Sequence, residues 1–201
     1  MKNIILCITI IALCCAGCAS FSNQSFRKEY IKITEGNLSE LSGAYFLPYI
    51  KNLEHPFSEF NGHVDLYSQI VNAPPWKSRK NKLDSLQVAE NQYVVQLDVI
   101  DAASVNIGLY ENNRLIKDTL IAGKLKNGMF YLKNIELDCQ GIPYIMGGCL
   151  HSKRRIGLSK RGNIIVNTAV DNTGALLLVI GTGYTFNSSY EFEKIKKVDT
   201  H

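Results

Sequence analysis

The chain has 201 residues, of which 46% are hydrophobic and 20% are charged, and its formal net charge is +4. This balance is typical of one globular domain and excludes a disordered acidic tail, a collagen-like repeat and a polytopic membrane protein. Because there are 15 glycines but only 5 prolines, no low-complexity linker is long enough to separate two domains.

Residues 1–17 have the pattern of an export signal. Lys2 is followed by an apolar run over residues 4–13, and small residues then lead to Cys18. A helix that spans a bilayer needs about 20 apolar residues, and this run ends several residues short of that length. We therefore expect the segment to be a signal peptide that is removed.

The sequence Cys-Ala-Gly-Cys at residues 15–18 resembles the lipobox of bacterial lipoproteins, although Cys15 stands where that family usually has leucine. The resemblance implies that Cys18 becomes the first mature residue, with a diacylglycerol on its sulfur and a further acyl chain on its amine. Ala19 rather than Asp follows, which in that family favours the outer membrane of the bacterial envelope. The alternative is an ordinary secretory peptide with coincidental cysteines.

Loss of the signal peptide removes Lys2 and leaves a net charge of +3. Such a weak excess predicts no long-range attraction to nucleic acid, so none is expected as a partner. The expected partners are the membrane, reached through the lipidated cysteine, and a small hydrophobic ligand or an envelope protein.

Only Cys139 and Cys149 remain in the body of the mature protein, and two cysteines in an exported domain most often pair. Closing this short loop is worth about 3 kcal/mol on the chain-entropy model. One alternative is a thiol and its base, because Cys149 and His151 are two apart and share a face of a strand. A zinc site would want four ligands, and the sequence has no further Cys/His cluster, so we expect neither a metal nor a cofactor.

Residues 18–37 are predicted to be a tether with one short amphipathic helical element, because Phe26, Tyr30 and Ile33 recur near a helical period. Residues 38–201 then form the single folded domain. A second helical turn is expected around residues 62–71, and Pro74 and Pro75 would stop it because neither can donate within a helix.

In the rest of the domain apolar and polar residues alternate with the period of a half-buried strand, and turn residues separate the alternating stretches. Turns are expected at Asn112-Asn113, at Asn127-Gly128, at Arg161-Gly162 and at residues 171–174, since these residues tolerate the backbone that tight turns require. The predicted strands cover residues 41–47, 93–99, 104–110, 114–124, 129–137, 153–160, 163–170, 175–180 and 184–193.

Strands joined by tight turns pair antiparallel, so the connectivity is an up-and-down meander. A meander of about eight strands with one apolar face most simply closes into a barrel, which removes its exposed edges. The pattern over residues 41–195 resembles the lipocalin or calycin architecture, although the Gly-x-Trp motif of that family is absent. The alternative fold is an open β-sandwich.

The sequence carries no Gly-x-Ser-x-Gly, no His-Glu-x-x-His and no phosphate-binding glycine loop, so no catalytic residue is predicted. Two sets of residues are candidates for binding. Inward-facing aromatics would line an apolar pocket, or simply fill a core. Basic residues on one face would contact an anionic partner, or form a solvated surface. The candidate ligand-binding aromatics are Tyr93, Tyr131, Tyr184, Phe186, Tyr190 and Phe192, and the candidate basic patch is Lys153, Arg155 and Arg161.

These observations favour a non-catalytic, membrane-anchored envelope lipoprotein that holds a small hydrophobic or amphipathic ligand inside its barrel. Such a protein needs an interior cavity lined by the aromatic residues. An interaction lipoprotein that binds an envelope partner through an outer face is the alternative, and it needs an exposed patch instead. A hydrolase with a dispersed site is the third hypothesis.

Overall fold

The computed structural model describes residues 19–22, 24–54, 64–71, 93–142, 146–176 and 180–195. Within these ranges it has ten β-strands, one α-helix and one 3-10 helix. In chain order they are β1 (Tyr30–Ile31), η1 (Glu35–Leu41), β2 (Gly43–Asn52), α2 (Leu66–Val71), β3 (Tyr93–Asp101), β4 (Ser104–Glu111), β5 (Arg114–Lys126), β6 (Met129–Leu132), β7 (Glu136–Ile142), β8 (Met146–Ser159), β9 (Ile164–Leu176) and β10 (Ile180–Lys194).

Eight of the ten strands close into a ring in the order β2, β3, β4, β5, β6, β8, β9 and β10. Every pairing is antiparallel, and the ring closes where β10 pairs β2, with Tyr190 opposite Asn52. The two remaining strands both pair β8, which they meet at different points along its length. The predicted mainly β meander, closed into a barrel of about eight strands with short helices near its N-terminus, is confirmed.

Two of the hairpin turns lie where the turn residues predicted them. Asn112 and Asn113 join β4 to β5 with φ angles of 48° and 65°, and Asn127 and Gly128 join β5 to β6 with φ angles of 54° and 77°. Asparagine and glycine adopt this left-handed region at low cost, and consecutive positive φ values match the twist of paired strands. The local sequence therefore specifies the register of these hairpins.

Buried apolar side chains fill the interior of the barrel. The strands contribute their inward positions, among them Tyr45, Leu97, Ile107 and Phe192, all of which are fully buried. The two helices complete the same cluster with Leu38 and Leu41 of η1 and with Leu66, Tyr67 and Ile70 of α2. Tertiary burial on this scale explains why so short a helix as α2 is stable, since isolated helices of this length are not.

The segment before the barrel packs against its wall. The helix expected from Phe26, Tyr30 and Ile33 does not form: the chain makes a turn at Phe26, whose carbonyl accepts from the amides of Glu29 and Tyr30, and then enters β1. Phe26 and Ile33 are nevertheless buried, as their apolar character predicts. The helical turn expected near residues 62–71 is present as α2, whereas residues 62, 63 and 74–76 lie outside the described ranges.

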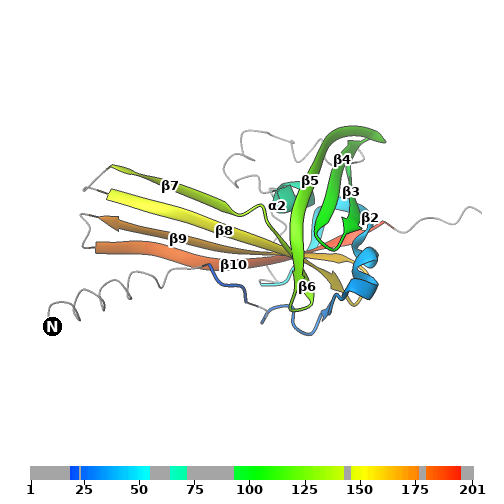
Figure 1. Ribbon diagram of the computed structural model, residues 1–201, viewed down its shortest axis with the longest axis horizontal. Coiled ribbons are helices and arrows are strands. Elements are labelled where there is room, and N and C mark those ends of the chain that lie inside the picture. Colours follow the sequence, from blue (N-terminus) through cyan, green and yellow to red (C-terminus); the bar gives the residue numbers. More distant parts are fainter. Residues whose placement is uncertain are drawn as a thin grey trace, which may run out of the picture.

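Four strands run on past the barrel as a projecting sheet, which we call the arm (Figure 1). It consists of residues 136–142 of β7, 146–152 of β8, 170–176 of β9 and 180–186 of β10, paired without a register shift. At about 3.3 Å per residue the arm is about 20 Å long.

The arm overturns two sequence predictions. The prediction of a turn at residues 171–174 is wrong, because these residues continue β9. They are paired with β8 on one side and with β10 on the other, and this pairing is more stabilising than the turn that their composition favours. The single strand expected over residues 129–137 is divided into β6 and β7, so that the chain leaves the barrel between them.

Candidate functional site

The six aromatic residues predicted to line a ligand pocket lie in three separate places. Phe192 is buried in the barrel core, and Tyr93 and Tyr190 pack against that core. Tyr131 belongs to a second cluster on the outside of the barrel wall. Tyr184 and Phe186 lie on the arm, where they are 56% and 44% exposed. The structure therefore does not bring the six together around one cavity.

The three basic residues predicted to share an exposed patch do not form one. Arg155 is only 2% exposed, Lys153 donates to a backbone carbonyl, and Arg161 pairs with a buried carboxylate. The acceptor of Arg161 is Glu191, which is fully buried and also accepts a hydrogen bond of 2.9 Å from Asn163 Nδ2. Each cation thus serves an internal contact.

Arg155 is the centre of a buried polar network on the outer side of the barrel wall. Its Nε donates to Asn167 Oδ1 at 2.7 Å, Nη1 donates to the Tyr131 hydroxyl at 3.0 Å, and Nη2 donates to the Ser22 carbonyl at 3.0 Å. Its guanidinium also lies over the Phe21 ring, 4.3 Å from the centroid. Burial lowers the pKa of Arg155 from its usual value, while the hydrogen bond with Tyr131 acts in the opposite direction.

The network continues to a carboxylate on the same side of the barrel. Asn167 Nδ2 donates to the Ser189 hydroxyl at 2.9 Å, which in turn donates to Glu54 Oε1 at 3.0 Å. The Ser25 hydroxyl donates to the same oxygen at 2.7 Å. The network thereby joins β6, β8, β9 and β10 to the segment before β1, and its bonds to Arg155 and Glu54 are charge-assisted, which are among the stronger kind.

Residues 19–22 are held at the base of the arm by these and neighbouring groups. Lys153 Nζ donates to the Ala19 carbonyl at 3.3 Å, and Asn187 Nδ2 donates to the Ser20 carbonyl at 3.1 Å. The Asn187 Oδ1 accepts from the Ser22 amide at 3.0 Å, and Ala19 is buried. The position that follows Cys18 is therefore a fixed part of the fold.

The arm has two different faces, because directly paired residues project to the same side and neighbours along a strand alternate. The N-terminal face carries Lys153 and Asn187 at its base and Leu137, Cys139, Cys149, His151 and Asp171 further out. The aromatic face carries Asp138, Gln140, Leu150, Tyr184 and Phe186.

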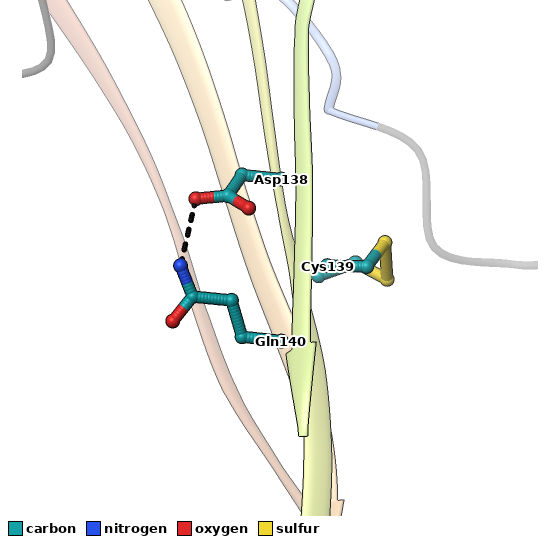
Figure 2. Close-up of a disulfide and its surroundings, with 4 residues drawn as sticks. Asp138, Cys139 and Gln140 are labelled. Atoms are coloured by element: carbon teal, nitrogen blue, oxygen red, sulfur yellow. Dashed lines mark hydrogen bonds between the residues drawn. A yellow bond between two sulfur atoms is a disulfide. The ribbon is translucent and has the colours of Figure 1, made fainter. Parts of the chain in front are cut away.

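A disulfide joins Cys139 and Cys149 directly across β7 and β8, as the cysteine count predicted. Figure 2 shows Cys139 on the opposite side of β7 from Asp138 and Gln140, whose side chains are hydrogen-bonded to each other. Because Cys149 is oxidised, it is not the thiol of a thiol and base pair with His151.

His151 lies directly opposite Asp171 on the N-terminal face. Burial and the positive charge of Lys153 lower the pKa of His151, and the Asp171 carboxylate raises it in part. The described residues contain no group of three histidine, cysteine or acidic side chains placed to hold a metal ion. The arrangement here is therefore that of an imidazole paired with an acid across two strands.

A groove of about 1030 Å³ lies on the outer side of the barrel, lined by β2, β3, the end of β10 and the turn at Arg161 and Gly162. Its lining includes Gly43, Gln96, Asp98, Glu193 and Lys194. Lys194 Nζ donates to the Glu40 carbonyl at 2.7 Å, and burial lowers the pKa of this lysine. None of the predicted aromatics lines the groove, whereas Arg161 does.

Comparisons with protein-family models, with curated proteins and with solved structures find no match to this chain. No helix in the described part of the chain has the length and apolar character needed to cross a membrane.

Proposed function

We propose that this protein is a non-catalytic lipoprotein of the bacterial cell envelope, lipidated at Cys18 and moored to the outer membrane, which acts through its outer surface. The observation that carries the proposal is the fixation of residues 19–22 at the base of the arm. Because Ala19 is held against the base of the arm, a lipid group on the preceding Cys18 would have a defined position on the protein.

The chemistry of the anchor supports the same proposal. A single acyl chain holds a protein only marginally, and two or more hold it firmly, at about 0.8 kcal/mol per buried methylene. Since Ala19 is bonded to Lys153, the acyl chains on Cys18 would leave the protein beside the arm. The arm would therefore be the part of the protein nearest the membrane.

The outer surface is a better binding site than the barrel interior. Side chains from the strands and from both helices fill that interior, and the predicted ligand aromatics are dispersed. The arm instead exposes large apolar side chains, including Leu137 at 68% exposure and the stacked pair Tyr184 and Phe186. Exposed apolar groups gathered on one element are typical of an interaction surface.

The test is mass spectrometry of the native protein from the membrane fraction. We expect the first mature residue to be Cys18 with diacylglycerol and acyl masses, and we expect Cys18→Ala to remain unprocessed. The matched control is Cys7→Ala, which removes a leader cysteine and should be processed and acylated like the parent. A parent protein that begins at Met1 without modification would overturn the proposal.

A further inference from the structure

Two segments of the chain lack charge, and the fold places them side by side. Residues 139–150 and 172–190 contain no aspartate, glutamate, lysine, arginine or histidine, although 20% of the whole chain is charged. The strand pairings gather most of both segments in the outer part of the arm. Charge is therefore excluded from one end of the molecule, which is unusual for a surface that faces only water.

The uncharged end can be defined by rows of paired residues. The outermost row contains Ile142, Met146, Leu176 and Ile180, and the fourth row contains Cys139, Cys149, Thr173 and Gly183. We call these four rows the uncharged end: residues 139–142, 146–149, 173–176 and 180–183. The joining residues 143–145 and 177–179 lie outside the described ranges, and in sequence they carry no charge either.

Charged and aromatic side chains follow immediately on the barrel side of this end. Asp138 lies in the fifth row and Asp171 in the sixth. Tyr184 also lies in the fifth row, and its ring stacks on Phe186 with the centroids 5.9 Å apart. Exposed tyrosine between an uncharged and a charged zone matches the aromatic belt found where membrane proteins cross from lipid to water.

We propose that the uncharged end of the arm inserts shallowly into a lipid bilayer, with Tyr184 at the outer edge of the headgroups. The inference rests on the proposed function, because a lipid anchor on Cys18 would hold the base of the arm at the membrane, and the arm, which is about 20 Å long, would then lie inclined to the bilayer with its uncharged end against it. Four rows span about 10 Å, whereas the headgroup region is about 5–8 Å thick on each side. Measured along the strands, the end is thus long enough to reach the boundary of the hydrocarbon, and the rows of Asp138 and Asp171 stay at or beyond the outer edge of the headgroups.

Shallow insertion also fits the backbone of the arm. In the described ranges β7 pairs only β8, and the arm portion of β10 pairs only β9, so the sheet has two open edges. Open edges are not tolerated deep in hydrocarbon, but headgroups and water satisfy them at the interface. Since the nearest charged residues are acidic, insertion should need no anionic lipid and should not weaken with salt.

The experiment measures the depth of one tryptophan in the full chain, in the form purified from membranes. In a Trp76→Phe background, Tyr184→Trp places the reporter at the edge of the uncharged end. The matched control is Phe46→Trp, which is on the outer barrel wall and similarly exposed at 44%. Each protein is mixed with phosphatidylcholine vesicles brominated high in the acyl chains, and circular dichroism confirms that both variants are folded.

We expect bromine to quench the tryptophan of Tyr184→Trp at least about twofold more than that of Phe46→Trp, because only the former would lie beside the headgroup layer, about 5–8 Å thick, that covers the brominated chains. Equal quenching of the two would overturn insertion. The mass spectrum of the same sample reports separately whether Cys18 is acylated. Failure of the anchor and failure of insertion are thereby distinguished.

A charge placed in the outermost row gives a second readout. In the Tyr184→Trp protein, Leu176→Asp should reduce quenching by about half or more, because a carboxylate is costly to insert. Leu120→Asp, at an exposed apolar position on the barrel, should leave quenching unchanged. Equal effects of the two changes would contradict the proposal. If the tryptophan of Tyr184→Trp is already shielded from solvent without lipid, and sedimentation shows a dimer, then a second copy of the chain covers the arm instead of a bilayer.

Discussion

Arg155 and Asn167 face each other directly across β8 and β9, and the guanidinium Nε donates to the amide Oδ1 over 2.7 Å although both side chains are almost fully buried. Such an arginine is retained only where its donors are satisfied, because a buried charge without partners is strongly destabilising. Its partners here include the Ser22 carbonyl, so the same side chain that stabilises the sheet also holds the start of the folded chain.

Replacement of this arginine should loosen the N-terminal segment and destabilise the barrel. Arg155→Met leaves the Asn167 and Tyr131 side chains and the Ser22 carbonyl without their donor, and we expect a loss of about 3 kcal/mol in the free energy of unfolding. Urea unfolding measures the loss, and amide hydrogen exchange at residues 19–22 measures the loosening.

Lys153→Met is the control for that change, because Lys153 lies two residues away on the same face and, among the described residues, makes one side-chain hydrogen bond, to the Ala19 carbonyl. We expect it to cost less than about 1 kcal/mol. Similar losses for Arg155→Met and Lys153→Met would show that Arg155 has no special part in holding the segment.

Two glycines offer a contrast between packing and backbone conformation. A Cβ at Gly123 would lie 2.2 Å from Phe130 Cε1 and 2.8 Å from the Tyr131 carbonyl oxygen, so Gly123→Ala should cost about 1–3 kcal/mol by overpacking. Gly162 has a φ of 81°, and a Cβ at this position would meet no atom within 4 Å, so Gly162→Ala should cost only about 1 kcal/mol of backbone strain. Thermal melts show which of the two variants loses more stability, and a larger loss for Gly162→Ala would contradict this expectation.

The barrel could be predicted because short stretches of the sequence determine its turns and its strands. Asn127 and Gly128 specify a tight hairpin by themselves, and alternation in segments such as β3 assigns each side chain to a face. Pairing of Cys139 with Cys149 followed from counting alone, since they are the two cysteines left in the body of the chain.

The arm and the Arg155 network were not predictable for the opposite reason. Residues 171–174 have the composition of a turn, and they stay extended only because β8 and β10 pair them on both sides. Arg155 reads as part of a solvated basic run, and its acceptor at Ser22 is 133 residues away in sequence. The one signal that could have revealed the arm is the absence of charge over residues 139–150 and 172–190.

Removal of the disulfide should weaken the arm without weakening the barrel. Cys139 and Cys149 are separated by 10 residues, and closing a loop of this size is worth about 3 kcal/mol on the chain-entropy model. In the Cys139→Ser, Cys149→Ser protein we expect faster amide exchange in β7 and in the outer part of β8, because only these strands are joined by the bridge. Exchange in β3 and β4 is the internal control, and equal acceleration there would contradict a local effect.

His151 should make the stability of the protein depend on pH in the mildly acidic range. Burial and Lys153 lower its pKa in the folded state below the ordinary value of about 6.5, so the unfolded chain binds the proton more tightly. The stabilising contribution is therefore complete above about pH 6.5 and is lost as the pH falls through the folded-state pKa.

His151→Gln removes this contribution, so the free energy of unfolding of the parent relative to the variant should decrease on acidification. Burial raises the pKa of Asp65, which acts in the opposite direction, but this group is present in both proteins and cancels in the comparison. Urea unfolding of both proteins between about pH 8 and about pH 5 measures the difference, and a difference that stays constant would show that His151 does not titrate within the folded arm as proposed.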